Sequence, residues 1–83
     1  MNLLDEKRTE TFNGKTYTTW HGSPFDRGSA DSWYSRPKDP HWYPEGSYKG
    51  IRIDAADMTP EELEAYDAGY EQNEQSGGKK DWD

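Results

Sequence analysis

The first patterned stretch of the chain, residues 9–20, has β-branched and aromatic residues on both sides of the polar pair Asn13-Gly14. Asn-Gly is the strongest short signal for a hairpin, because a type I′ turn needs positive φ at both central residues. The pattern therefore predicts a β-hairpin over residues 9–20. An isolated hairpin is marginal in water, so we expect Phe12, Tyr17 or Trp20 to pack on another element.

A helix start follows at Ser23-Pro24-Phe25-Asp26, where serine takes the N-cap, proline the first helical position and an acid the third. The predicted helix spans residues 24–35 and ends before Pro37, because proline disfavours the helical conformation of the residue preceding it. Small residues recur in this helix about once per turn and would let another backbone approach closely. They are Gly28, Ser29 and Ser32.

Prolines and glycines interrupt the next stretch, residues 36–57, at positions 37, 40, 44, 46 and 50. We expect an ordered aromatic loop, because leaving Trp42, Tyr43 and Tyr48 all exposed would be unfavourable in a soluble protein. Ile51-Arg52-Ile53 has the composition of a very short strand. We expect this strand to pair with an edge of the hairpin.

The clearest local signal is a second helix start at Met58-Thr59-Pro60-Glu61-Glu62-Leu63. Threonine takes the N-cap, glutamate the third helical position, and the flanking apolar residues suit a hydrophobic staple. The predicted helix covers residues 60–74, with Leu63, Tyr66 and Tyr70 on one face. We expect this face to form a core with the first helix.

Together these elements predict a single small α+β domain with an N-terminal β-hairpin, two α-helices and an ordered Pro/aromatic loop between them. The domain covers residues 9–75, between a flexible N-terminus of residues 1–8 and a tail of residues 76–83. A chain of 83 residues buries only about 60–65% of its unfolded surface. Apolar residues make up 29% and charged residues 33%, which leans toward disorder, but four Trp and six Tyr favour a small aromatic core.

The net charge of −7 opposes direct binding to nucleic acid, where affinity comes largely from lysine and arginine neutralising phosphates. An acidic protein can instead bind a basic surface of another protein. The sequence has no cysteine, no signal-peptide pattern and no apolar run long enough for a membrane span. We therefore expect a soluble cytoplasmic protein, with no membrane partner and with an oligomeric state that remains open.

Metal and catalytic chemistry have little support. Two histidines, His21 and His41, lie far apart in the chain and lack a third ligand. Serines 29, 32 and 35 with His41 and Asp31 contain the residue types of a hydrolase triad but lack a nucleophile elbow. We therefore predict no catalysis, metal or cofactor, and expect His41 to donate to a backbone carbonyl within the loop and His21 to lie at a turn.

Cations and aromatics lie close together around the end of the first helix, as they do in single-strand nucleic-acid binders. The residues are Arg27, Arg36 and Lys38, with Trp33, Tyr34, Trp42 and Tyr43. The favoured interpretation is intramolecular, with Arg27 or Arg36 paired to Asp31 or to the acidic second helix.

Residues 54–74 carry eight acids and no lysine, arginine or histidine. Such a run is usually a solvated helix face, but carboxylates at helical spacing can also imitate phosphates in a basic groove. The contact surface predicted from the aromatic loop and the acidic helix consists of Trp33, Arg36, His41, Trp42, Tyr43, Glu64, Asp67 and Glu71.

Two short motifs resemble ribosome-modulation-factor-like small proteins, a family with members encoded by tailed bacteriophages. They are Arg27-Gly28-x-x-Asp31-x-x-Tyr34-x-Arg36-Pro37 with Pro40-His41, and Ala65-Tyr66-x-Ala68-Gly69-Tyr70. The resemblance implies a glycine-containing helix, a proline-containing turn and a second helix ending in a Gly-aromatic pair. The bacterial founding members are basic and bind the ribosome, whereas this chain is acidic. The phage-type members imply an accessory protein that binds a host protein in the host cytoplasm.

The function predicted from the sequence is a non-enzymatic, acidic protein-binding protein. Its partner would be a host or cellular protein with a basic surface, and binding would modulate or inhibit that partner. The alternatives are a ribosome-associated modulation factor and a DNA-mimic inhibitor of a nucleic-acid-binding protein.

Overall fold

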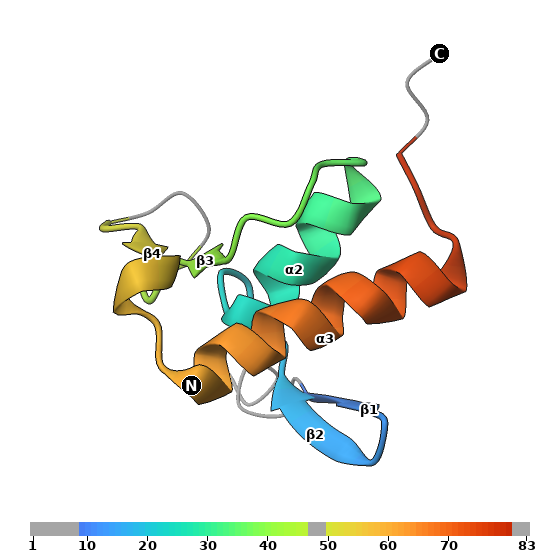
Figure 1. The fold of residues 1–83 in the computed structure, drawn as a ribbon, viewed down its shortest axis with the longest axis horizontal. Helices are drawn as coiled ribbons and strands as arrows, with labels where there is room; N and C mark the ends of the chain where they lie inside the picture. The colour runs from blue at the N-terminus through green and yellow to red at the C-terminus, as the bar shows by residue number, and fades with distance from the viewer. Residues whose placement is uncertain (1–8, 47–49, 81–83) are drawn as a thin grey trace, which may run out of the picture.

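The computed structural model describes residues 9–46 and 50–80. Its elements are β1 (Thr9–Phe12), β2 (Lys15–Thr18), α2 (Pro24–Trp33), β3 (His41–Trp42), β4 (Ile53–Asp54), the 3₁₀ turn η1 (Ala55–Asp57) and α3 (Pro60–Ser76). They form a compact α+β domain in which α2 crosses α3, with the β1–β2 hairpin and the β3–β4 pair at separate places around the two helices (Figure 1). The predicted fold class is confirmed. The predictions for residues 1–8, for Tyr48 and for the last three residues lie outside the described part.

The hairpin forms as its turn residues predict. Asn13 and Gly14 adopt φ of 52° and 81°, and β1 pairs antiparallel with β2 in the register Phe12↔Lys15 and Thr11↔Thr16. The hairpin is attached to the helices through Tyr17, whose ring stacks on Phe25 of α2 at a centroid distance of 5.3 Å. This contact extends into a cluster that includes Ala68 of α3, so the hairpin packs on both helices.

Helix α2 begins where its cap predicts and ends earlier than expected. Ser23 Oγ accepts a hydrogen bond from the Asp26 amide at 3.3 Å. The helix ends at Trp33 rather than at residue 35, because Ser35 takes a left-handed conformation with φ of 60°. The Arg36 amide then donates to the Asp31 carbonyl at 2.8 Å, so the chain has already turned away before Pro37.

Helix α3 has the predicted capping box, with Thr59 and Glu62 each accepting a hydrogen bond from the backbone amide of the other. It ends at Ser76, two residues beyond the predicted end, because Gly77 provides the left-handed C-cap with φ of 77°. The residues after Gly77 return to α2. The Lys80 amide donates to the Trp33 carbonyl at 2.7 Å, so this part of the predicted tail packs on the domain.

The two helices touch backbone to backbone at a pair of glycines. A Cβ built on Gly28 of α2 would lie 1.9 Å from the Tyr66 carbonyl oxygen, and one built on Gly69 of α3 would lie 2.0 Å from the Phe25 carbonyl oxygen. The expectation that small residues allow a close backbone approach is confirmed for Gly28. Tyr66, fully buried beside this crossing, is the largest side chain with no exposed surface.

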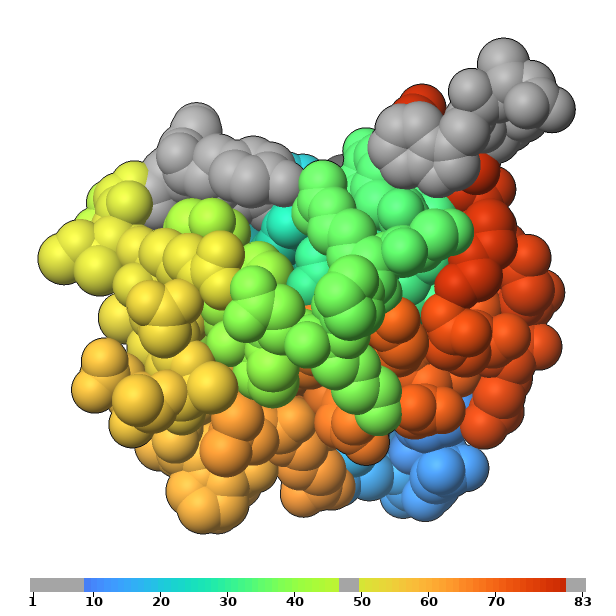
Figure 2. Space-filling view, turned by 45° about the horizontal axis from the view of Figure 1, so that its top comes forward, coloured from blue at the N-terminus to red at the C-terminus, as the bar shows by residue number. Residues whose placement is uncertain are grey.

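The loop of residues 36–57 contains two short strands. β3 pairs antiparallel with β4, in the register His41↔Asp54 and Trp42↔Ile53. The predicted pairing of residues 51–53 with the hairpin is therefore wrong, and the strand itself is Ile53–Asp54. Gly46 and Gly50 have positive φ. Pairing β4 with β3, which is nearer in sequence, costs less loop-closure entropy than pairing it with the distant hairpin. Residues 36–44 lie across the molecule between the β4 region and α3 (Figure 2).

Candidate functional site

A buried polar centre connects the two helices. Asp31 of α2 is 2% exposed and accepts hydrogen bonds from the Tyr66 hydroxyl and, at 3.2 Å, from Arg36 Nη1. The Tyr66 oxygen in turn accepts from the Asp39 amide at 2.9 Å. Burial and the hydrogen bond to Asp31 raise the pKa of Tyr66 well above its usual value. The charge of Asp31 is therefore satisfied within the fold.

His41 lies next to this centre and is held by both ring nitrogens. Arg27 Nε donates to His41 Nε2 at 3.2 Å, and an arginine can only donate. The ring hydrogen therefore sits on Nδ1 and is donated to the Asp39 carbonyl oxygen at 2.6 Å. This confirms the predicted bond from His41 to a loop carbonyl, and His21 lies at a turn as expected.

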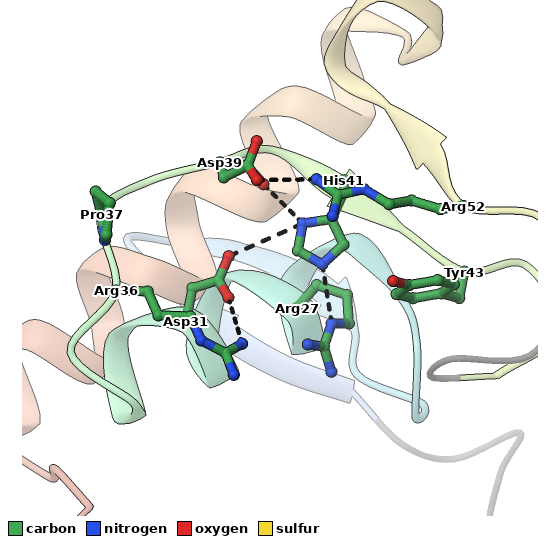
Figure 3. Close-up of a pocket in the computed structure, with 8 residues that line it drawn as sticks. All are labelled: Arg27, Asp31, Arg36, Pro37, Asp39, His41, Tyr43 and Arg52. Atoms are coloured by element: carbon green, nitrogen blue, oxygen red, sulfur yellow. Dashed lines mark hydrogen bonds and ion pairs between the residues drawn. The ribbon is translucent and has the colours of Figure 1, made fainter.

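The arginine pocket opens beside His41 and has a volume of about 320 Å³ (Figure 3). Figure 3 shows the His41 ring between Arg27 on one side and the two aspartates on the other, with Arg52 reaching Asp39 from the β4 side. The residues that line this pocket are Arg27, Asp31, Arg36, Pro37, Asp39, His41, Tyr43 and Arg52.

The aromatic groove is a second hollow, of about 410 Å³, formed by β2, the start of α2, β3 and the first turns of α3. Consecutive side chains of a strand point to opposite faces, so His41 lines the arginine pocket and Trp42 lines the aromatic groove. Trp20 meets Trp42 edge to face at 6.0 Å. The residues of the groove are Lys15, Thr16, Tyr17, Thr18, Trp20, Pro24, Trp42, Glu61, Glu62 and Ala65.

The predicted acidic surface of α3 is tied to lysines. Lys15 Nζ lies 3.1 Å from both Glu64 carboxylate oxygens, and Lys38 forms ion pairs with Asp67 and, at 2.7 Å, with Glu71. These bonds lower the pKa of Glu64 and raise the pKa of Lys38 to about 12. Much of the negative charge on this face is thus compensated within the chain.

The eight predicted contact residues do not form one surface. Trp33 is exposed near Gly78, and Trp42 lies in the aromatic groove, while Glu64, Asp67 and Glu71 lie along α3. Arg36, His41 and Tyr43 line the arginine pocket. His41 and Tyr43 are only 4% and 8% exposed, and both contact Arg27 of α2. Their role in binding a partner stays a prediction.

The intramolecular interpretation of the cations is confirmed. Arg36 pairs with Asp31 and lies over the Tyr34 ring at 4.8 Å. Lys38, rather than an arginine, makes the ion pairs to the acidic second helix. Ser32, one of the residues with triad chemistry in the sequence, donates to Glu74 of α3 at 2.7 Å and accepts from Lys79.

Several site residues were missed by the sequence reasoning. Trp20 and Pro24 had been assigned only to the hairpin and the helix start, and Arg52 only to a short strand, although they line the groove and the pocket. The alternation of strand side chains was the available signal, because it separates Trp42 from His41 and Tyr43. No local pattern indicates that Arg52 meets Asp39, thirteen residues earlier.

Within residues 9–46 and 50–80, no three acids or histidines cluster closely enough to hold a metal ion. None of the described helices has the length and apolar character needed to cross a membrane. No family model matches the chain, and neither a curated protein nor a solved structure shows significant similarity to it. The resemblance to ribosome-modulation-factor-like proteins therefore stays a prediction.

Proposed function

We propose that this chain is a non-enzymatic protein-binding protein whose aromatic groove takes an extended, basic segment of its partner. The observation that carries the proposal is the outer edge of β2, which pairs with no other strand among the described residues and runs along a groove lined by aromatic and acidic side chains. Strand addition to such an edge is a common mode of peptide recognition. Main-chain hydrogen bonds supply affinity, and pockets for alternate side chains supply specificity.

The hairpin register defines which groups of β2 point outward. Phe12 and Lys15 flank a two-residue turn and form a hydrogen-bonded pair, so the next pair, Thr11 and Thr16, directs its amides and carbonyls away from the partner strand. The same alternation places Thr18 outward, and its carbonyl accepts from Ser23 Oγ at 3.0 Å. In the part of the chain that the structure describes, no hydrogen bond reaches the outward amide of Thr16.

The groove beside this edge has the chemistry for a basic, partly apolar segment. Trp20, Trp42 and Pro24 supply apolar surface, while Glu61 and Glu62 lie at its rim in the first turn of α3. Aromatic residues dominate the energetics of interfaces. The net charge of −7 would also steer a basic partner toward the molecule.

A DNA mimic would need the carboxylates of α3 to be available for binding to a basic surface, but three of them are paired with lysines of the same chain. Glu64 is bonded to Lys15, and Asp67 and Glu71 to Lys38. Their pairing supports binding through the groove over imitation of phosphates by the α3 surface. That the partner is a host protein of a phage, or a ribosomal component, rests on the resemblance alone.

The experiment is a selection of extended peptides from a random library on the whole chain, followed by NMR mapping of the selected peptides. We expect sequences rich in lysine or arginine that perturb the amides of Thr16 and Thr18. The key variant is Thr16→Pro, which removes the outward amide without removing a hairpin bond. Its matched control is Thr11→Pro, which removes the corresponding amide from the opposite edge of the hairpin.

Two further variants test the side chains. Trp20→Ala and Glu61→Lys should each weaken peptide binding about tenfold or more, whereas Trp33→Ala, an exposed tryptophan outside the groove, should not. Thermal melts establish that each variant is folded. Equal effects of Thr16→Pro and Thr11→Pro, or peptides that map to Trp33, would contradict the proposal.

A further inference from the structure

A further hollow adjoins the aromatic groove at Trp20. This Glu45 hollow has a volume of about 320 Å³, and Trp20 lines both it and the aromatic groove. The residues of the Glu45 hollow are Trp20, His21, Pro44, Glu45 and Gly46. Trp20 is therefore a wall that the two hollows share.

Both hollows lie on the same face of the segment that contains β3. Side chains of an extended chain alternate between two faces. His41 and Tyr43 line the arginine pocket, with their rings 5.6 Å apart (Figure 3). Trp42 lines the aromatic groove and Pro44 the Glu45 hollow. The two hollows are therefore neighbours along one face and lie opposite the arginine pocket.

The two hollows also follow one another in the same order along both of their walls. On the hairpin side, residues 15–18 line the aromatic groove, Trp20 lines both hollows and His21 lines the second. On the β3 side, Trp42 lies in the groove and residues 44–46 lie in the Glu45 hollow. An extended segment that runs along β2 toward its C-terminal end would therefore pass Trp20 and reach the Glu45 hollow.

Each hollow has one exposed carboxylate that the fold does not use. Glu61 lies in the aromatic groove and Glu45 in the Glu45 hollow. Within residues 9–46 and 50–80, neither carboxylate accepts a hydrogen bond or forms an ion pair. Glu62, by contrast, accepts from the Thr59 amide in the capping box. Two unengaged carboxylates are therefore available to a partner, one in each of the hollows that share Trp20.

We propose that the partner's extended segment carries two basic side chains, one on each side of Trp20, and that the second is bound in the Glu45 hollow. Lysine and arginine have a long apolar stem below a charged head. Each stem would lie against the Trp20 ring while its head meets a carboxylate. Lys15, which also lines the groove, is already paired with Glu64. This inference rests on the proposed function, because it extends the same binding groove.

The test is a set of NMR titrations of the whole chain with synthetic serine- and threonine-rich peptides. One peptide carries a single lysine, and the others carry two lysines separated by two, four or six positions, which places both on one face of a strand. We expect one spacing to bind about three- to fivefold more tightly than the single-lysine peptide, as an exposed ion pair allows. That peptide should also shift the amide signals of Glu45 and Gly46. The other two-lysine peptides have the same charge and control for general attraction.

Glu45→Gln should abolish the advantage of the second lysine without weakening the single-lysine peptide. Its matched control is Glu10→Gln, which removes the same charge from an exposed position of β1 outside both hollows and should keep the advantage. Thermal melts establish that both variants are folded.

The outcomes separate this inference from the proposed function. If single-lysine and two-lysine peptides bind equally and Thr16→Pro weakens both, the groove binds a segment without the Glu45 hollow, which overturns the inference alone. An equal gain at every spacing, or an equal loss in Glu45→Gln and Glu10→Gln, would show general charge attraction and would also overturn it. Absence of peptide binding, or binding that Thr16→Pro does not change, would overturn both the inference and the proposed function.

Discussion

Gly28 of α2 and Gly69 of α3 are reciprocal partners at the helix crossing, each lying against a carbonyl of the opposite helix. The Gly28 position abuts the Tyr66 carbonyl, and the Gly69 position abuts the Phe25 carbonyl. These two backbone approaches bring Tyr66 deep enough to reach Asp31. The glycine pair therefore determines how the polar centre under the arginine pocket is assembled.

Gly28→Ala should destabilise the domain by about 3 kcal/mol or more, which is a large part of the stability of so small a domain. The physical reason is that the added Cβ would lie 1.9 Å from a backbone oxygen, so the helices must separate. Urea denaturation followed by circular dichroism provides the measurement.

The matched control for this substitution is Gly78→Ala. Its Cβ would meet nothing closer than the Trp33 ring at 3.4 Å, and we expect a change within about 0.5 kcal/mol. Similar losses for the two variants would show that the helix crossing is not the cause.

Tyr66→Phe should cost about 2–3 kcal/mol, because it leaves buried Asp31 without its hydroxyl donor and the Asp39 amide without its acceptor. Tyr70→Phe serves as the comparison. Its hydroxyl donates to the Arg36 carbonyl at an exposed position, so the loss should be below about 1 kcal/mol. Denaturation curves of the two variants measure the difference, and equal losses would contradict the importance of the buried centre.

Thr59→Ala should destabilise the protein by about 1 kcal/mol, because Thr59 Oγ1 accepts from the Glu62 amide in the capping box of α3. Thr59→Ser keeps a hydroxyl at the same place and should remain close to the unmodified protein. Chemical denaturation of the three proteins side by side provides the measurement. If Thr59→Ser is also less stable than the unmodified protein, the loss in Thr59→Ala comes from the threonine methyl group rather than from the capping hydroxyl.

Stability should fall at acidic pH through Glu64 and Glu74. Hydrogen bonds from Lys15 and Lys79, respectively, lower the folded-state pKa of these carboxyls below their usual 4.5. Their contribution is therefore complete above the unfolded-state pKa and is lost as the pH falls through the folded-state pKa. Urea midpoints measured between pH 6 and about pH 3 should decrease, and less steeply in Glu64→Gln.

Glu10→Gln is the control for the acid series, because it removes a carboxyl from the exposed face of β1 and leaves the Glu64 bonds intact. If Glu64→Gln and Glu10→Gln reduce the loss of stability at acidic pH equally, the cause is a general charge effect.

At alkaline pH, stability should fall through Lys38, whose ion pairs raise its folded-state pKa to about 12. The contribution of these ion pairs is complete below the unfolded-state pKa of lysine and is lost as the pH rises through the folded-state pKa.

Local signals predicted the secondary structure well wherever a few neighbouring residues decide it. The Asn13-Gly14 turn and the caps at Ser23 and Thr59 all formed as predicted. Helix ends were less accurate, because Ser35 and Gly77 take left-handed conformations that set the last turn of each helix. The predicted pairing of residues 51–53 with the hairpin was wrong, because strand pairing depends on residues far from the strand in sequence.

The candidate site was harder to predict. The sequence predicted that Arg27 or Arg36 pairs with Asp31 or with the acidic second helix, and the Arg36–Asp31 pair is one of these alternatives. The predicted bond from His41 to a loop carbonyl also formed, and in both cases the partners are near in sequence. Sequence reasoning did not find Arg52 in the arginine pocket or Trp20 in the aromatic groove. These placements depend on how segments separated by more than ten residues return to α2.

The sequence by itself determined the element types, the turn and cap positions, the acidic charge and the small-residue positions at which helices can meet. These features follow from local backbone preferences and composition, which need no knowledge of distant contacts. Tertiary structure alone decided that Tyr43 is buried while Trp42 lines a groove, and that lysines neutralise the acids of α3. The reason is physical: burial and ion pairing depend on which segments approach in space, and the Gly28–Gly69 crossing sets that approach here.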